Sequence, residues 1–254
     1  MSIQSKIAAP VFIIAASLVP ASAGIVTFSG EDILATTTSA HPNSAAAAAS
    51  FDAAVAGLGT GSLVTFEGAP LGSFSNLTIA PGVTLNGTDF NGNNQTIRDT
   101  SNSPSFPTLD GYNTTAGGSN FVEMQAGTLT FTFSSGVEAF GAYFSGVQDF
   151  YPNEAITFSD GASQLISMPE AGTSGSVGAL DFVGFTDAGE SISSITINAG
   201  NASVGADFIG VDDVRFLTVP TVTGTPEPGA LGLAVSGLVA LGFVVLRRRR
   251  TAQA

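Results

Sequence analysis

The chain has no cysteine and no tryptophan, and only one histidine among its 254 residues. Without cysteine it can form neither a disulfide framework nor a thiolate metal site, so an exported domain has to gain its stability from the size of its core. The single histidine, His41, argues against a Ser-His-Asp or Cys-His arrangement and excludes metal centres built from several histidines. The lack of tryptophan counts against a high-affinity aromatic platform for sugars.

Basic residues are also scarce, with 7 Lys and Arg against 20 Asp and Glu. Five of the seven lie near the termini, which leaves only Arg98 and Arg215 in residues 24–225. Two basic and nineteen acidic residues give this body a net charge of −17. Nucleic acid is excluded as a partner, because phosphate binding depends on Lys and Arg. Cations or neutral polysaccharide fit better, although acidity can simply keep an extracellular protein soluble.

Long apolar runs are confined to the two ends of the chain. At the N-terminus, Lys6 precedes a mostly apolar stretch over residues 7–19, and Ala21 and Ala23 form a small-residue cleavage site. This order is typical of a secretory signal peptide, and the apolar stretch is too short for a retained span. Residues 1–23 are therefore predicted to be removed, and the mature chain is expected to begin at Gly24.

The second apolar run covers residues 229–246, which include no charged side chain. As a helix its 18 residues would reach about 27 Å, close to the thickness of the hydrocarbon core of a bilayer. Four arginines follow at once, Arg247, Arg248, Arg249 and Arg250, and basic residues beside a span stay on the cytoplasmic side. The body is then expected outside the membrane. An ordinary stop-transfer anchor would have the same features.

Directly before this span stand Pro226, Glu227 and Pro228, where two prolines keep the chain extended and exposed. Residues 226–254 resemble the PEP-CTERM sorting signal of Gram-negative bacteria. The resemblance implies that exosortase, a membrane-embedded enzyme similar to cysteine transpeptidases, recognises Pro226, Glu227 and Pro228. It also implies a transient span over residues 229–246, the four arginines as the cytoplasmic stop, and an association with exopolysaccharide and biofilm formation.

The body, residues 24–219, has the composition of a β-rich domain. Seventeen of the 19 phenylalanines lie there, which argues against disorder. Leu129, Phe131 and Phe133 alternate with threonines, and Phe140 and Phe144 follow after the turn residues 134–136, a pattern that predicts a hairpin. Further strands are predicted at residues 63–66, 77–79, 83–85, 155–158, 164–168, 180–185, 192–197 and 208–217. Such spacing favours an antiparallel β-sandwich of jelly-roll type.

One helix is expected in the body, over about residues 44–59, which are rich in alanine. Asn43 or Ser44 is expected to cap it, and the helix should cover an edge or end of the sandwich. Residues 86–119 are dominated by Asn, Gly, Ser, Thr and Pro, and we expect a long loop region there, where binding surfaces are common. Residues 220–225 form a short linker to the sorting signal.

A pair of acids in the last predicted strand suggests a metal site. Ile209 and Val211 have one parity and Val214 and Phe216 the other, and Asp212 and Asp213 lie where the phase changes. A β-bulge there would place a carboxylate at a kink where oxygen ligands can gather around Ca²⁺, with Asp207 and Glu67 as further ligands. A similar Asp-Asp-Val element occurs in jelly-roll carbohydrate-binding modules. Equally, an inward Asp could bond loop amides, or both faces of the strand could be buried.

Three hypotheses for function follow from these patterns. The first is a non-enzymatic structural or adhesive protein of the cell surface or extracellular matrix of a Gram-negative bacterium, sorted by exosortase and associated with extracellular polysaccharide. The second is a calcium-dependent, lectin-like carbohydrate-binding module. The third is a carbohydrate-active enzyme, which would need two carboxylates about 5 to 10 Å apart in a cleft.

Overall fold

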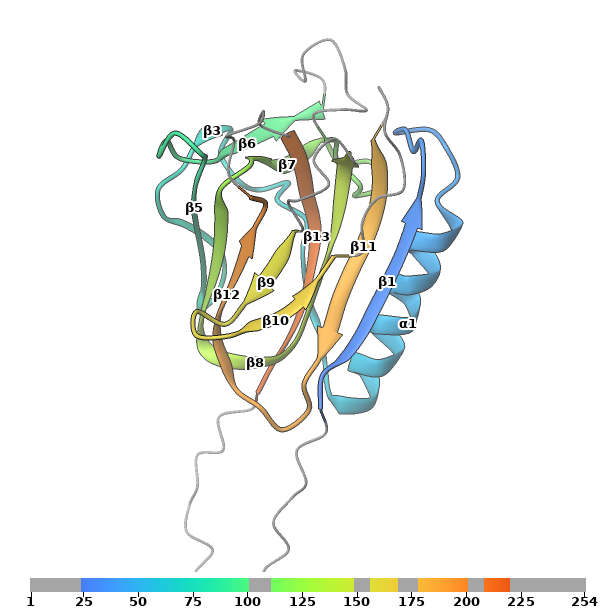
Figure 1. Cartoon of the computed structure of the whole chain (residues 1–254), viewed down its shortest axis with the longest axis vertical. Coiled ribbons are helices and arrows are strands. Elements are labelled where there is room, and N and C mark those ends of the chain that lie inside the picture. Colours follow the sequence, from blue (N-terminus) through green and yellow to red (C-terminus); the bar gives the residue numbers. More distant parts are fainter. Residues whose placement is uncertain (1–23, 101–110, 149–155, 169–177, 201–207, 220–254) are drawn as a thin grey trace, which may run out of the picture. The chain divides into compact units, whose positions relative to one another are not determined.

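The computed structural model describes residues 24–100, 111–148, 156–168, 178–200 and 208–219 (Figure 1). The predicted signal peptide, the linker, the sorting signal and Asp207 lie outside these described residues. Met1–Val219 and Pro220–Ala254 form two separate units, and every described helix and strand belongs to the first. Within the described ranges, no helix is long and apolar enough to cross a membrane.

One helix and thirteen strands make up the described part of the chain. In order they are β1 (Val26–Asp32), α1 (Pro42–Leu58), β2 (Ser62–Val64), β3 (Gly72–Ser73), β4 (Leu77–Ala80), β5 (Val83–Thr88), β6 (Thr96–Asp99), β7 (Asn120–Gln125), β8 (Thr128–Val147), β9 (Thr157–Ser159), β10 (Gln164–Ser167), β11 (Ala179–Thr186), β12 (Ile192–Asn198) and β13 (Phe208–Thr218). All of their pairings are antiparallel. The antiparallel β class with one alanine-rich helix is thereby confirmed.

The long strand β8 bends near its middle and takes part in both layers of the fold (Figure 1). Residues 128–133 pair with β12 and β5, in a layer ordered β10-β9-β12-β8-β5-β4. From Val137 onward β8 pairs with β11 and β13, in a layer ordered β1-β11-β8-β13-β7-β6-β3. Gly136 lies at the corner, where a Cβ would collide with Ser191.

The predicted hairpin at residues 129–144 is therefore wrong. The two halves of β8 form no ladder with each other and instead face one another across the core, with the rings of Phe131 and Phe140 5.0 Å apart. The alternating apolar residues were correctly identified, but residues 134–136 turn the strand from one layer into the other rather than back along itself. Period-2 patterning marks a buried face and carries no information about the pairing partner.

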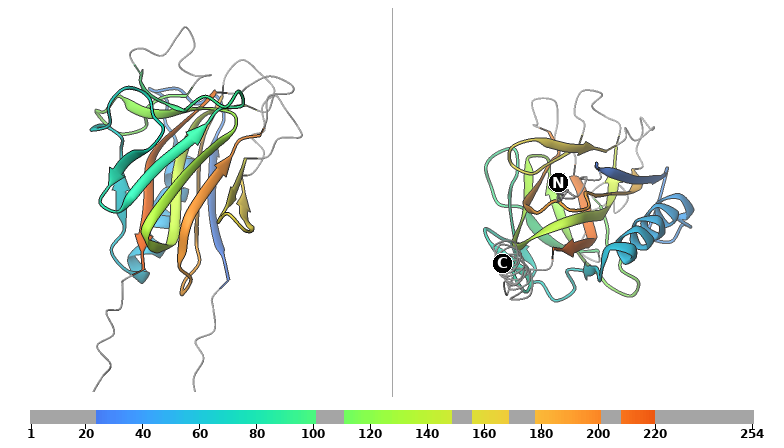
Figure 2. Two further views of the ribbon diagram at one scale, coloured as in Figure 1. Left: turned by 90° about the vertical axis from the view of Figure 1, so that its left-hand side faces the viewer. Right: turned by 90° about the horizontal axis from the view of Figure 1, so that it is seen from below.

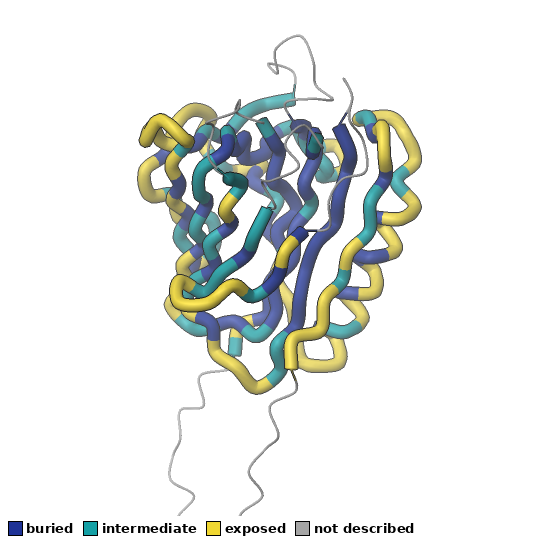
Figure 3. Tube along the Cα trace, viewed as in Figure 1, coloured by how far each residue is buried: buried dark blue, intermediate teal, exposed yellow. Residues whose placement is uncertain are grey.

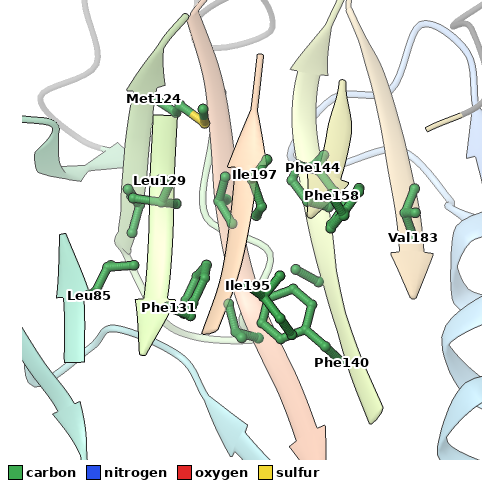
Figure 4. Close-up of a cluster of buried hydrophobic side chains, with 14 of the residues drawn as sticks. Leu85, Met124, Leu129, Phe131, Phe140, Phe144, Phe158, Val183, Ile195 and Ile197 are labelled. Atoms are coloured by element: carbon green, nitrogen blue, oxygen red, sulfur yellow. The ribbon is translucent and has the colours of Figure 1, made fainter. Parts of the chain in front are cut away.

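Alternate side chains of the two layers meet between them and form the main core. Figure 4 shows side chains from both layers, among them Phe131, Phe140, Phe158 and Ile195, pointing toward one another. The opposite face of the second layer carries Ala139, Phe182 and Leu217, which pack against Phe51 and Val55 of α1. Because both of its faces are covered, β11 is buried along its whole length (Figure 3).

The helix lies against the edge strand β1 and its neighbour β11, outside the strands when the fold is viewed from below (Figure 2). This position agrees with a helix that covers one edge of the sandwich. The helix begins at Pro42, and its N-cap residue, His41, makes no capping hydrogen bond with its side chain. The expected cap at Asn43 or Ser44 is therefore wrong. Instead Asp32, at the end of β1, accepts hydrogen bonds from Asn43 N (3.1 Å), Ser44 N (2.9 Å) and Ser44 Oγ (2.7 Å).

Replacing Asp32 with alanine is expected to lower the free energy of unfolding by about 1–2 kcal/mol, because the first amides of α1 lose their acceptor. Burial acts to raise the pKa of Asp32, but the hydrogen bonds from Ser44 and Asn43 outweigh it and hold that pKa below its usual range. The stability that Asp32 contributes is thus fully present at pH values above the pKa of Asp in the unfolded chain. It is lost as the pH falls through the lower pKa that Asp32 has in the folded protein. Urea denaturation at pH 7 measures the effect, and an Asp32→Ala protein as stable as the parent would contradict it.

Residues 86–119 are only in part the loop region that the sequence suggested. β5 continues through Asn86 to Thr88, and β6 follows at Thr96–Asp99 and pairs with β7. β1, β3 and β7 were also not among the predicted strands. In β7 all residues but Gln125 are buried, so its sequence NFVEMQ has no alternation to detect.

Candidate functional site

The phase change in β13 is a β-bulge, as predicted. Asp212 lies opposite Tyr143 of β8, whereas Arg215 lies opposite Gly141, so two residues of β13 face one residue of β8. Asp213 takes up the extra length with a φ of 48°, in the left-handed region. As a result Ile209, Val211, Val214 and Phe216 all reach the inter-layer core. The side chains of Asp212 and Arg215 lie on the opposite face of the layer, against which α1 packs.

Asp212 holds a loop in place. Its side chain is fully buried, and Oδ2 accepts hydrogen bonds from Thr114 N (2.7 Å), Thr115 N (3.1 Å) and the hydroxyls of both threonines (3.1 and 3.3 Å). Thr115 Oγ1 also donates to Asp213 Oδ1 (2.7 Å). Burial raises the pKa of Asp212 to about 7, although the hydrogen bond from the Thr114 amide acts to lower it. Both interpretations left open beside the metal site match the structure: Asp212 is bonded to loop amides, and residues 209–214 of β13 are buried on both faces.

Two further side chains hold the same loop, residues 111–119, which we call the clasped loop. At its C-terminal end Glu67 accepts from the amides of Ser119 (2.9 Å to Oε2) and Asn120 (3.1 Å) and from Asn113 Nδ2 (2.7 Å). At the other end Ser145 Oγ of β8 accepts from Tyr112 N and donates to Tyr112 O, both at 2.8 Å. The loop is thus fixed by side chains from three separate parts of the chain.

The four acids proposed for calcium divide into different roles. Asp212 and Asp213 are neighbours on one side of the clasped loop, Glu67 binds the far end of it, and Asp207 lies outside the described residues. Among the described residues, no three or more His, Asp or Glu side chains are grouped so that they could hold a metal ion. Asp212 Oδ2 and both oxygens of Glu67 are occupied by protein donors. The calcium site stays a prediction.

Beside the clasped loop lies a pocket of about 330 Å³. One wall is formed by residues 37–39 and His41, which precede α1, and by Ala45 in its first turns. The opposite wall is formed by Tyr112, Asn113 and Thr114 of the clasped loop. Tyr143, Leu180, Asp213 and Arg215 complete the lining from β8, β11 and β13.

Arg215, one of the two basic residues of the body, is already engaged within the protein. Its guanidinium carbon lies 5.2 Å from the ring centre of Tyr143 and 5.5 Å from that of Phe182. Nε forms an ion pair with Asp52 of α1 at 3.3 Å, and Nη1 donates to the carbonyl of Asp213 at 2.8 Å. Its charge is therefore balanced by Asp52, and its place over Tyr143 is fixed.

The wall that contains His41 is also cross-linked. His41 Nε2 lies 2.9 Å from the carbonyl oxygen of Thr36 and 3.1 Å from Ser39 Oγ. Because a carbonyl oxygen can only accept, Nε2 is the donor in its contact with Thr36. The sequence argued against a catalytic role for His41, but it gave no reason to place His41 in a pocket.

Four buried polar side-chain atoms have no hydrogen-bond partner among the described residues: Tyr112 OH, which belongs to the pocket lining, and Asp181 Oδ2, Asp212 Oδ1 and Arg98 Nε, which belong to residues outside that lining. Burial, followed by the charges of Glu31 and Asp32, raises the pKa of Asp181 to about 8. Burial and the charges of Asp32 and Asp181 raise the pKa of Tyr112. Buried polar groups are rarely left unpaired in native proteins, so the unpartnered Tyr112 OH distinguishes the lining of this pocket.

A second, more acidic hollow of about 260 Å³ is lined by Asp160, Asp187 and Glu190. Asp160 is committed to its own turn, where Oδ1 accepts from Ala162 N (2.8 Å) and Ser163 N (2.7 Å). Burial, and then the charge of Glu190, raises the pKa of Asp187. Asp187 and Glu190 are the carboxylates in which the enzymatic alternative has to be tested.

Two glycines make the approach of the clasped loop possible, and they are the signal that sequence reasoning missed. Gly111 has a φ of 83°, and a Cβ on it would lie 2.1 Å from the backbone nitrogen of Gly210. Gly210 stands within a strand, where glycine often marks a close approach of another backbone segment. Two tyrosines lie on this face, Tyr112 buried and Tyr143 half-buried.

Comparison with known proteins finds similarity only among solved structures. No family model matches the chain, and no curated protein matches it in sequence. Among solved structures, the K2 cleaved adhesin domain of Lys-gingipain is similar at a TM-score of 0.40 and 17% identity, over 63% of this chain and 100% of that one. The K1 cleaved adhesin domain of Lys-gingipain from Porphyromonas gingivalis W83 has a TM-score of 0.38 and 11% identity, over 63% and 99%. These values are too low to assign a family or a function.

Proposed function

We propose that this protein is an exported, non-enzymatic adhesive or structural component of the surface or extracellular matrix of a Gram-negative bacterium, built on a jelly-roll-like sandwich. The observation that carries the proposal is the use of the acidic side chains. Asp212 and Glu67 bind the amides of one loop, and that loop forms the wall of a polar pocket. Acids that hold a surface loop in position suit a binding surface better than a reaction centre.

The two ends of the sequence support the route to the surface. The signal peptide at residues 1–23 would export the chain, and the Pro226-Glu227-Pro228 motif with its span and arginine cluster would present it to exosortase. The high negative charge of the body suits a protein that is associated with extracellular polysaccharide. The same charge makes the body a poor partner for nucleic acid.

Replacing Glu227 with alanine in the full chain, expressed in a bacterium with an exosortase, is expected to leave an unprocessed precursor at the membrane. Deleting Arg247 to Arg250 should have the same effect, because the cytoplasmic stop is lost. Thr225→Ala, just outside the motif, is the matched control and should be processed normally. Intact-mass spectrometry of cell fractions measures the result, and unchanged processing of the Glu227→Ala chain would refute exosortase sorting.

The carbohydrate-binding module is a second candidate, and the polar pocket with two cross-linked walls favours it. Titration calorimetry with Ca²⁺ and with polysaccharide separates the cases: a calcium-dependent module gives saturable heat for both, and a purely structural protein gives it for neither. The enzymatic alternative would require that Asp187→Asn or Glu190→Gln abolish a glycan-cleaving activity of the parent protein.

A further inference from the structure

We infer that the pocket between the clasped loop and the residues before α1 binds one or two rings of a neutral polysaccharide. This inference rests on the proposed adhesive function and gives it a site and a ligand class. The pocket volume of about 330 Å³ lies at the small end of the range for ligand pockets and suits a short stretch of sugar rather than a whole oligosaccharide.

Both walls are held in place without a ligand. The clasped loop is fixed at Tyr112 by Ser145 and at Thr114 by Asp212, and the wall before α1 is fixed by the contact of His41 with Thr36. Since these bonds are made within the protein, little conformational entropy has to be lost on binding. A shallow site with few strong contacts depends on such preorganisation.

The charge balance of the pocket favours a neutral ligand. Among the described lining residues the only Lys or Arg side chain is Arg215, which is paired with Asp52, while Asp213 adds a carboxylate. The body around the pocket carries a net charge of −17, which repels polyanions such as uronate-rich chains. An anionic sugar would therefore bring a charge that no free cation of the described lining can balance.

The lining matches the groups of a sugar ring. The hydroxyl of Thr37 can both donate and accept, and Asp213 adds an acceptor. The hydroxyl of Ser39 is already bonded to Thr36 and His41, and that of Thr38 lies 3.4 Å from Thr36 Oγ1. The partly exposed Tyr143 has Arg215 over one face of its ring, so only its remaining surface is left to pack against the apolar face of a sugar ring. Tyr112 OH, buried and without a partner among the described residues, is a further group that a polar ligand could satisfy.

The test uses Ala45→Trp, which fills the pocket from an exposed helix position without removing a contact of the clasped loop. Ala46→Trp, one residue further and equally exposed but outside the pocket lining, is the matched control. Calorimetric titration of the processed protein with maltopentaose, cellopentaose and the neutral exopolysaccharide of the producing bacterium measures affinity, and tetragalacturonate serves as the anionic probe.

Saturable binding of at least one neutral probe, weakened tenfold or more by Ala45→Trp and less than twofold by Ala46→Trp, is the expected result. Preference for tetragalacturonate, equal effects of the two tryptophans, or no saturable binding of any probe would overturn the inference. Processing at the Pro226-Glu227-Pro228 motif is measured on the same Ala45→Trp chain and should be normal, so failure of the site and failure of sorting remain distinct.

Discussion

Asp212→Ala is expected to lower the free energy of unfolding by about 3 kcal/mol, because it leaves the Thr114 and Thr115 amides without their acceptor and opens a small cavity. For a domain of this size the melting temperature should fall by about 10 °C. Asp212→Asn should lose less, since its amide oxygen can still accept at the Oδ2 position, while its NH₂ group lies at the place of the unpartnered Oδ1. Thermal and urea unfolding measure both variants.

Asp89→Ala is the matched control for this prediction. Asp89 also accepts from two backbone amides, Asn91 N at 2.7 Å and Asn93 N at 2.8 Å, but these bonds lie at the protein surface. Water can replace an exposed acceptor, so the expected loss is below about 1 kcal/mol. Equal losses for Asp212→Ala and Asp89→Ala would show that Asp212 has no special role in holding the clasped loop.

Stability is expected to increase as the pH is lowered from about 8 to about 5, which is the opposite of ordinary acid denaturation. The pKa values of Asp181, about 8, and Asp212, about 7, are raised mainly by burial. Between those values and the pKa of unfolded Asp, the folded state holds protons that the unfolded state has released, so stability is lost as the pH rises. Because a pKa difference of one between the folded and unfolded states corresponds to about 1.4 kcal/mol, the two groups together amount to several kcal/mol. The melting temperature at pH 5 should exceed that at pH 8 by about 10 °C.

Asp181→Asn tests the source of this slope. The amide cannot ionise, so the variant should gain stability at pH 8 relative to the parent and show a flatter pH profile. Below about pH 4 the trend should reverse in both proteins, because Asp32, Asp89 and Asp160 have lowered pKa values and lose their hydrogen-bonded charge there. A parent protein whose melting temperature falls steadily from pH 8 to pH 5 would contradict the assignment of buried, protonated acids.

The bulge in β13 shows what the sequence could predict. The switch of apolar parity between Val211 and Val214 suggested one extra residue at Asp212 and Asp213, and the structure has a β-bulge there. The antiparallel class and the helix followed in the same way from local periodicity. Each of these features depends on residues close together in the chain.

The features that were missed depend on contacts between distant residues. Asp32 reaches the first turn of α1 from the end of β1, and Glu67 and Asp212 reach the clasped loop from 52 and 98 positions away. Nothing in the sequence around Thr114 indicates these partners. The hairpin error has the same origin, because the alternation of Phe131 and Phe140 marks their burial but not the layer to which each half of β8 belongs.

The central claim, that this is an adhesive matrix protein and not an enzyme, is tested most directly by co-sedimentation with extracellular polysaccharide. The processed protein is mixed with the polysaccharide of the producing bacterium, the bound fraction is measured against concentration, and the chain length of the polysaccharide is followed in the same tubes. We predict saturable co-sedimentation with polysaccharide chains of unchanged length. Protein that remains in the supernatant at every concentration, or polysaccharide that shortens with time, would contradict this claim.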